Sequence, residues 1–155
     1  MTGRERVLKD AADRGIAVEL IERVKASSLE EAASIMGISP ADIVKSLVVK
    51  RSDDTFLFAL IPGDKQIAWA KLRAVVGVNK LQLPDKDVAL EATGYERGTI
   101  TPLGSTTAWP VFADASIVGK RVSLGAGEHG LSVFVEADDL IAAFDATVAD
   151  ISDPA

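Results

Sequence analysis

The chain has 155 residues, of which 48% are hydrophobic, 26% charged and 5% aromatic, and its formal net charge is −6. This length suits one domain with a core built mainly of Ala, Val, Leu and Ile. The absence of cysteine excludes a disulfide scaffold, a thiol nucleophile and a cysteine-ligated zinc, and the single histidine, His129, excludes a histidine-rich metal site. No apolar run approaches the roughly 20 residues of a membrane span, and the charged N-terminus lacks the apolar stretch of a signal peptide, so we expect a cytoplasmic protein.

Helices and strands alternate along the first half of the chain. Apolar residues at helical spacing, with capping residues and closing glycines, indicate helices, whereas β-branched apolar runs between turn residues indicate strands. The helices expected here cover 4–14 up to Gly15, a segment from the S-x-x-E capping box at Ser28 to Gly37, a short turn at 40–42 capped by Ser39, and 69–76 up to Gly77. The strands expected here cover 16–24, 43–50 and 55–61, with turns at 52–54 and 62–64.

The second half of the chain contains the longest predicted loop, over residues 94–110. This stretch is rich in glycine, proline and threonine, and long structured loops inside a domain often carry function. The other elements expected here are a strand at 80–83, a helix over 84–93 closed by Gly94, strands at 111–113, 121–124 and 131–135, a helix over 137–144, and a frayed tail over 150–155. Without repeats or a linker, the pattern predicts one α+β domain with a mixed sheet.

The basic residues gather in the middle of the chain although the net charge is negative. Residues 45–86 carry 8 basic and 4 acidic groups, whereas residues 87–155 carry 3 basic and 11 acidic groups. A local basic segment can meet a phosphate backbone even on an acidic protein. The alternative is that these lysines and arginines are ordinary solvated surface residues.

The segment 125–130 has the spacing G-x-G-x-x-G, but it does not fit a dinucleotide-binding fingerprint. Such a fingerprint has to open a helix, whereas the residues that follow, LSVFVE, alternate like a strand. We therefore interpret the segment as a tight loop between two strands, with backbone N–H groups free to face a ligand. His129 lies at the tip of this loop, where an exposed histidine without a function is the alternative.

Two further segments are candidates for a functional site. Lys45 stands in an apolar run, and a lysine there is costly to bury unless it has an anionic partner or opens into a pocket; the alternative is a solvated strand face. The segment 98–104, GTITPLG, can present backbone amides to an ester carbonyl or a water; the alternative is a plain crossover loop. Neither a G-x-S-x-G elbow nor a P-loop is present.

These segments, in this order, resemble the YbaK/ProX family of aminoacyl-tRNA deacylases, whose domain also occurs as the editing insertion of bacterial prolyl-tRNA synthetases. The matching features are the I-V-K-S-L-V strand around Lys45, the G-Y-E-R-G-T-I-T-P-L-G run over 94–104, the glycine loop at 125–130 with the strand and D-L helix after it, and the S-x-x-E-A-A helix start at Ser28. The resemblance covers about residues 16–145 of the chain.

The resemblance implies a single YbaK-like editing domain over 1–155, with its core at about 16–145 and a curved, barrel-like mixed β-sheet flanked by helices. It implies a trans-editing hydrolase that cleaves the ester between a wrong amino acid and the 3′-terminal adenosine of a tRNA, expected to be a mischarged proline tRNA. The implied partners are aminoacyl-tRNA and an aminoacyl-tRNA synthetase. We expect a monomer or homodimer that uses no membrane, cofactor or metal.

The resemblance also implies three catalytic residues. Lys45 would hold the terminal phosphate or the ester region, the backbone of Gly98 would orient the water or the substrate amino group, and His129 matches a histidine that some members carry in the late loop. Ser46 departs from the Thr or Asn common at its position, which leaves the amino acid that is removed open. The substrate-binding residues expected are Ser46, Thr99, Thr101, Pro102, Gly125 and Gly127.

Elementary energetics agree with an editing role. A synthetase pocket separates amino acids that differ by one methylene by only about 1–3 kcal/mol, so a second sieve is needed. Because an ester is already activated, a positioned water and backbone oxyanion donors suffice for its hydrolysis. We expect a small pocket that excludes the cognate amino acid, with the acceptor stem faced by the basic residues Lys45, Lys50, Arg51, Lys65, Lys71 and Arg73. Two alternatives are a non-catalytic tRNA- or synthetase-binding module and a small-molecule esterase unrelated to tRNA.

Overall fold

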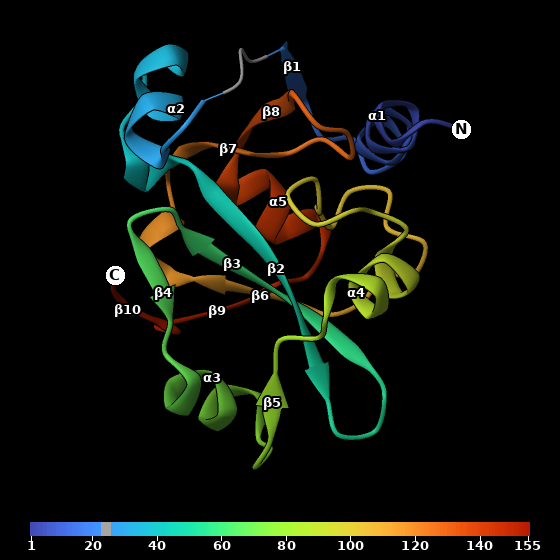
Figure 1. Cartoon of the computed structure of the whole chain (residues 1–155), viewed down its shortest axis with the longest axis vertical. Helices are drawn as coiled ribbons and strands as arrows, with labels where there is room; N and C mark the ends of the chain where they lie inside the picture. The colour runs from blue at the N-terminus through green and yellow to red at the C-terminus, as the bar shows by residue number, and fades with distance from the viewer. Residues whose placement is uncertain (23–25) are drawn as a thin grey trace.

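A long β-hairpin runs through the middle of the molecule. The computed structural model describes residues 1–22 and 26–155 (Figure 1). Strand β2 (Val44–Arg51) pairs with the antiparallel strand β3 (Phe56–Pro62) along nearly its whole length. Asp54 adopts a left-handed φ of 62° in the connecting turn, a conformation that Asp and Asn tolerate better than most residues. The predicted hairpin is therefore confirmed.

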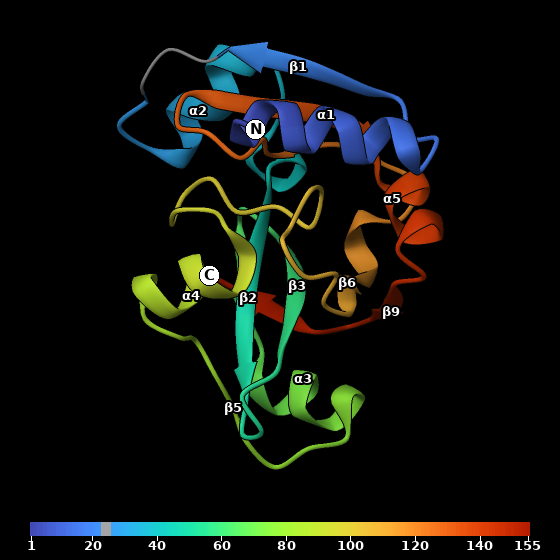
Figure 2. The ribbon, with the colours of Figure 1, turned by 90° about the vertical axis from the view of Figure 1, so that its right-hand side faces the viewer.

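Across the described residues the strands form three sheets. Besides the hairpin, the strands are β1 (Val18–Glu22), β4 (Lys65–Ile67), β5 (Leu81–Gln82), β6 (Val111–Asp114), β7 (Arg121–Gly125), β8 (Leu131–Glu136), β9 (Thr147–Ala149) and β10 (Ser152–Pro154). The largest sheet is mixed, with the order β5-β2-β3-β6-β9, because β6 runs parallel to both β3 and β9. The antiparallel sheet β1-β8-β7 lies across one end of the hairpin, and β10 pairs with β4 (Figures 1 and 2).

The helices pack around these sheets, and their ends follow local capping chemistry. They are α1 (Gly3–Asp13), α2 (Leu29–Met36), α3 (Trp69–Val76), α4 (Lys86–Thr93) and α5 (Ala137–Ala143), with 3₁₀ turns at Pro40–Asp42 and Ala115–Ile117. The Ser28 hydroxyl accepts from Glu31 N at 3.0 Å, but the Glu31 carboxylate bonds Ser27, so only half of the predicted capping box forms. Ser39 precedes its turn without a capping hydrogen bond. In the part of the chain that is described, no helix combines the length and apolar character needed to cross a bilayer.

The five-stranded sheet separates two apolar clusters. Because side chains alternate along a strand, Phe58 and Leu60 of β3 face one cluster, while Leu57, Ala59 and Ile61 face the other. The first and larger cluster lies between this sheet, the three-stranded sheet, α1 and α5. The second is closed by α3 and by the C-terminal segment. Every residue of β3 is buried, as expected for a strand that is covered on both faces.

The C-terminal residues do not fray as predicted. Ile151 is completely buried, its backbone N–H donates to Asp114 Oδ1 at 3.1 Å, and β10 pairs with β4 from Ser152 opposite Ile67. Strands β4, β9 and β10 have only three residues each, which is too short for an alternating pattern to show in the sequence. The prediction of a tail over 150–155 is therefore wrong.

The predicted α+β class with a mixed sheet is confirmed, but the strands do not close into a barrel. The described part of the three-stranded sheet joins β2 through a single bridge, between Ile43 and Ser123, instead of a continuous ladder. The core also extends beyond 16–145, since Val7, Ala11 and Ile151 are buried. The predicted strand over 16–24 is found as β1, and its last positions fall outside the described residues.

Candidate functional site

A cleft of about 540 Å³ follows the free edge of strand β2 and forms the candidate site. It is lined by residues 43–48, 83–84, 97–98 and 123–125 together with Ala89, Ile100 and Ser132, a set named here the β2 cleft. This volume lies within the range typical of small-molecule sites and exceeds what the side chain of an amino acid needs. The cleft is therefore larger than the small pocket that was expected.

The cleft exists because β2 lacks a strand partner along part of its edge. On the side away from β3, β5 pairs with β2 at Lys50 and Arg51, and the Ile43–Ser123 bridge lies at the opposite end. Over the described residues between these points, no strand ladder covers the edge. An uncovered strand edge presents backbone donors and acceptors that a ligand can use.

Lys45 and Ser46 lie next to each other on the edge but point to opposite faces of the sheet. Lys45 is half-buried, and its ammonium donates to the backbone carbonyl of Lys65. Burial lowers the pKa of Lys45 below its usual value, and the nearby Asp64 carboxylate opposes this effect only partly. The Ser46 Oγ atom is buried and has no hydrogen-bond partner among the described residues, and Ser46 is one of the residues that line the cleft.

The loop over 94–104 contributes Arg97, Gly98 and Ile100 to the cleft. Gly98 has φ +89°, which favours glycine over any residue with a side chain. A Cβ atom placed on Gly98 would lie 3.8 Å from His129 Cε1, so the structure brings these two predicted residues together. His129 itself is exposed, and its Nε2 lies 3.0 Å from Glu96 Oε2.

Three residues of this loop that were predicted to bind substrate do not line the cleft. Thr99 is buried and donates through Oγ1 to Glu96 O at 2.8 Å, and the buried Thr101 Oγ1 accepts from Leu103 N at 3.2 Å. Pro102 lines a separate hollow beneath α1. Because the threonine hydroxyls bond their own loop, they shape it instead of facing the cleft.

Gly125 and Gly127, two predicted site residues in the glycine-rich segment 125–130, lie in different surroundings. Gly125 lines the cleft, whereas Gly127 packs against Gly3 and Tyr95, and its N–H donates to Thr99 O at 3.0 Å. The backbone N–H of Gly127, which was expected to face a ligand, therefore joins the two loops. Of the predicted site residues, Lys45, Ser46, Gly98 and Gly125 share the cleft, and His129 lies beside Gly98.

Sequence reasoning missed three polar residues of the cleft. Ser123 and Ser132 are almost completely buried between apolar neighbours in β7 and β8, and Arg97 precedes Gly98. A serine at a buried strand position is a signal that could have been read from the pattern. The contribution of Arg97 depends on the conformation of the loop, which local periodicity does not encode.

The fold places the basic residues of the segment 45–86 in different surroundings. Lys71 forms ion pairs at 3.1 Å with both Asp150 and Asp153, so its charge is already compensated. Four other basic residues, Lys50, Arg51, Arg73 and Lys80, line a second hollow of about 460 Å³. The basic hollow and the β2 cleft are neighbours along the chain: β2 lines the cleft with residues 44–48 and the hollow with Lys50 and Arg51, and the segment 79–82 of the hollow leads into residues 83–84 of the cleft. Within the described residues, no group of three or more His, Asp and Glu side chains could hold a metal.

Residues 24–143 match the model of the aminoacyl-tRNA editing domain family. The match covers most of the chain, and it includes both the β2 strand and the two loops of the cleft. The protein therefore belongs to the aminoacyl-tRNA editing domain family.

Two curated relatives and two solved structures are similar to this chain. The chain is 33% identical over 132 residues to the proline–tRNA ligase of Thermosipho africanus and 29% identical over 132 residues to that of Bacillus velezensis, covering 82% and 83% of this chain. It spans only 23% of each ligase. The structure of a candidate trans-editing enzyme for prolyl tRNA synthetase superimposes with a TM-score of 0.89 at 25% identity, over 99% of this chain and 98% of that one. The hypothetical protein APE2540 gives a TM-score of 0.87 at 26% identity, over 96% and 99%.

Proposed function

We propose that the protein is a trans-acting hydrolase that removes a wrongly attached amino acid from a tRNA, with mischarged proline tRNA as the first candidate. The observation that carries the proposal is the meeting of Lys45, Gly98 and Gly125 in one cleft of a protein of the editing domain family. The cleft lies on an uncovered strand edge, where backbone groups can bond a substrate.

The reaction is the hydrolysis of an ester. Water adds to the carbonyl carbon, the bond from that carbon to the ribose oxygen breaks, and the products are a free amino acid and a tRNA with a free 3′-terminal hydroxyl. The Gly98 backbone orients the water or the substrate amino group, and the Lys45 ammonium holds the phosphate or ester region. His129 lies at the mouth beside Gly98, where it positions the substrate. This arrangement works through orientation and charge and needs no protein nucleophile.

The size of the β2 cleft fits an amino acid together with part of the terminal nucleoside. The basic hollow then accepts the phosphates that follow, because two of its basic residues, Lys50 and Arg51, continue β2 beyond the cleft. Of the basic residues expected to face the acceptor stem, Lys50, Arg51 and Arg73 line this hollow, where Lys50 is paired with Asp54 at 3.1 Å, whereas Lys65 and Lys71 do not line it.

The direct test is to incubate the purified protein with tRNAs charged with Ala, Cys, Ser, Thr or Pro and to follow the loss of the labelled amino acid. We expect selective loss from one mischarged tRNA, and Pro-tRNA should stay intact. If all esters persist while tRNA still binds with an affinity that falls with salt, the protein is a binding module.

A second arm of the experiment addresses the small-molecule esterase. Simple aminoacyl esters are offered at the same concentration as the charged tRNA. Faster turnover of the tRNA ester supports tRNA editing, because the basic hollow can contribute only when phosphates are present. Equal turnover of both would contradict it.

A further inference from the structure

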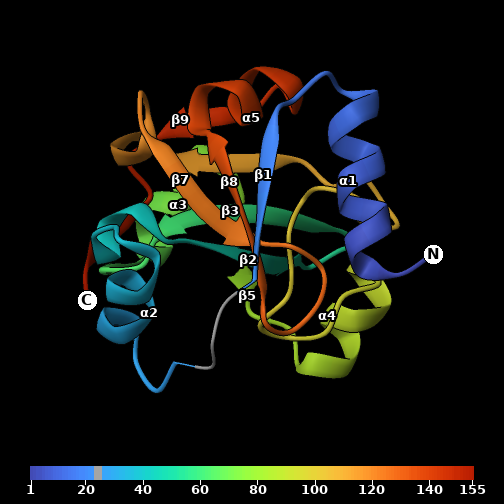
Figure 3. The ribbon, with the colours of Figure 1, turned by 90° about the horizontal axis from the view of Figure 1, so that it is seen from above.

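Helix α1 lies against both loops that form the mouth of the β2 cleft, although it precedes the residues matched by the family model. Figure 3 shows α1 beside the 94–110 loop and the tip of the β7–β8 loop. At its first turn, Arg4 N donates to Glu128 Oε2 at 2.7 Å. A Cβ atom on Gly3 would come within 2.0 Å of Gly127 O, so the two backbones are in direct contact.

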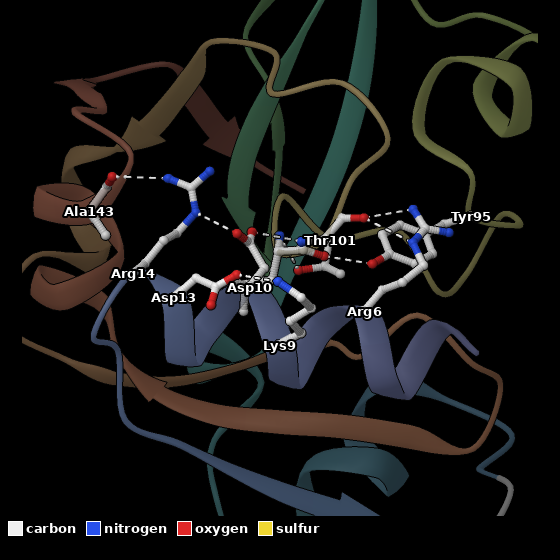
Figure 4. A network of polar contacts seen from close by, with 10 residues as sticks. Arg6, Lys9, Asp10, Asp13, Arg14, Tyr95, Thr101 and Ala143 are labelled. Carbon is white, nitrogen blue, oxygen red and sulfur yellow. Dashed lines mark hydrogen bonds and ion pairs between the residues drawn. The ribbon is translucent and has the colours of Figure 1, made fainter. Parts of the chain in front are cut away.

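Arg6 is the centre of this contact (Figure 4). Its guanidinium donates to the carbonyls of Thr93, Gly94 and Gly104, at distances between 2.6 and 3.2 Å. These carbonyls lie at the start and the end of the 94–104 loop, so one side chain closes the loop. No carboxylate forms a salt bridge with Arg6 in the described part of the chain. All of these hydrogen bonds go to backbone carbonyls, and this set of contacts is named here the Arg6 clamp.

Two neighbours complete the clamp. The Arg6 guanidinium lies 4.3 Å above the ring of Tyr95, whose hydroxyl donates to Leu103 O at 2.7 Å and so joins the two ends of the loop again. Asp10 accepts from Gly104 N at 2.8 Å. Burial raises the pKa of Tyr95 to about 12, which keeps this hydroxyl protonated as a donor.

The front of the same loop is part of the catalytic surface. Gly98 lines the cleft and lies beside His129, and the two loops are joined by the bond from Gly127 N to Thr99 O at 3.0 Å. We propose that Arg6 is a positioning residue that holds the 94–104 loop from behind, so that Gly98 is presented to the cleft at a fixed place beside His129. This inference rests on the proposed function for its catalytic consequence, and on the contacts alone for the position of the loop.

The chain offers a matched control on the same helix. Arg14 also places a half-buried guanidinium over an aromatic ring, 3.9 Å from that of Phe144, and donates to a backbone carbonyl, Ala143 O at 3.2 Å (Figure 4). Those partners belong to the end of α5 and the residue after it, far from the cleft loops in sequence. Arg14→Ala therefore removes the contact of α1 with α5 and the ion pair from Arg14 Nε to Asp10 Oδ1 at 3.0 Å, while the Arg6 hydrogen bonds and the bond from Gly104 N to Asp10 Oδ2 remain.

The experiment compares Arg6→Ala, Arg6→Lys and Arg14→Ala by amide hydrogen exchange and by single-turnover deacylation. Both Arg6 variants should accelerate exchange at Tyr95, Thr99, Leu103 and Gly104 by at least about tenfold, since they lose several hydrogen bonds to the loop. The rate should fall by about 100-fold with KM within about twofold, because a misplaced loop orients the water poorly. Lysine should not rescue, since it lacks the planar fork of arginine.

Arg14→Ala should leave loop exchange and rate within about threefold of the unmodified protein. The proposal is overturned if Arg6→Ala leaves both readouts unchanged, or if Arg14→Ala lowers both as far as Arg6→Ala at equal stability. If Arg6→Ala does not fold, Tyr95→Phe removes only the bond to Leu103 O and should change both readouts in the same direction, by a smaller factor. If the unmodified protein deacylates no tRNA, the proposed function fails, and the exchange data still decide whether Arg6 holds the loop.

Discussion

The two faces of the β2–β3 hairpin differ in the groups that cover them. The face opposite the cleft is closed by α3 and the C-terminal segment, and Val49, Leu57, Ile61, Leu72 and Ile151 are all completely buried there. The cleft face also has a large apolar cluster, but its rim consists of loops held by polar contacts.

The difference shows how one small domain separates stability from substrate binding. The closed face stabilises the fold through the burial of these apolar side chains. Among the described residues, the cleft face keeps an uncovered strand edge and a buried Ser46 hydroxyl without a hydrogen-bond partner. Such groups reduce stability unless a ligand satisfies them. Substitutions of the buried apolar side chains on the closed face should therefore change stability, and substitutions of residues that line the cleft should change activity. Lys45 belongs with the cleft, which it lines, although its side chain leaves β2 on the same side as Leu47 and Val49.

The largest effect on activity is expected for Lys45→Ala. Loss of the ammonium that holds the phosphate or ester region should lower the single-turnover deacylation rate by about 100-fold or more. The free energy of unfolding should change by less than about 1 kcal/mol, because the substitution removes a half-buried ammonium that makes a single hydrogen bond, to Lys65 O. Lys65→Ala, which keeps that carbonyl, is the control and should retain near-full activity. Full activity in Lys45→Ala would remove Lys45 from the mechanism.

The largest effect on stability is expected for Ile151→Ala on the closed face. Truncating a completely buried isoleucine should cost about 2–5 kcal/mol of unfolding free energy, measured by urea denaturation. The deacylation rate below the melting temperature should not change. Val148→Ala, at a side chain that is 41% exposed, should cost less than about 0.5 kcal/mol. A slower rate in folded Ile151→Ala would show that the two faces are coupled.

Asp114 makes the closed face sensitive to acid. Burial raises the pKa of this carboxyl, but hydrogen bonds from the Ser116 hydroxyl and N–H and from Ile151 N outweigh burial, and the pKa lies below its usual value. Its contribution to stability is therefore complete above the unfolded pKa of about 3.9 and is lost as the pH falls through the lower folded value. Asp114→Asn should cost about 1–3 kcal/mol at pH 7, and the gap should shrink in urea titrations below about pH 4. A constant gap would contradict this account.

The smallest effects are expected on tRNA binding, for a lysine in the basic hollow and for one outside it. Lys80→Ala, in the basic hollow, should weaken tRNA binding and reduce the slope of log K against log salt by about 1. Lys71→Ala should change neither quantity, because its charge is paired with Asp150 and Asp153. Equal losses in both variants, measured by filter binding at several salt concentrations, would remove the basic hollow from the tRNA surface.

Local signals were sufficient for most elements of the fold. The hairpin, α3 and α4 could be predicted because turn residues, closing glycines and apolar spacing all act within a few residues. β10 could not be predicted, because its partner β4 is more than 80 residues earlier in the chain. The candidate site divides in the same way: Lys45, Ser46, Gly98 and Gly125 share the cleft, whereas Thr99 and Thr101 bond their own loop.

The ordered motifs of the sequence were enough to indicate the family and the segments that form the site, because those features depend on residue types at fixed spacing. Only the tertiary structure showed that the Lys45 ammonium bonds the backbone of Lys65, that the charge of Lys71 is paired with Asp150 and Asp153, and that Arg97 lines the cleft. The same holds for Arg6, whose hydrogen bonds join residues 87 to 98 positions apart. Contacts between residues so far apart in the sequence depend on how the helices and strands pack, and the residues next to each partner in the sequence do not indicate them.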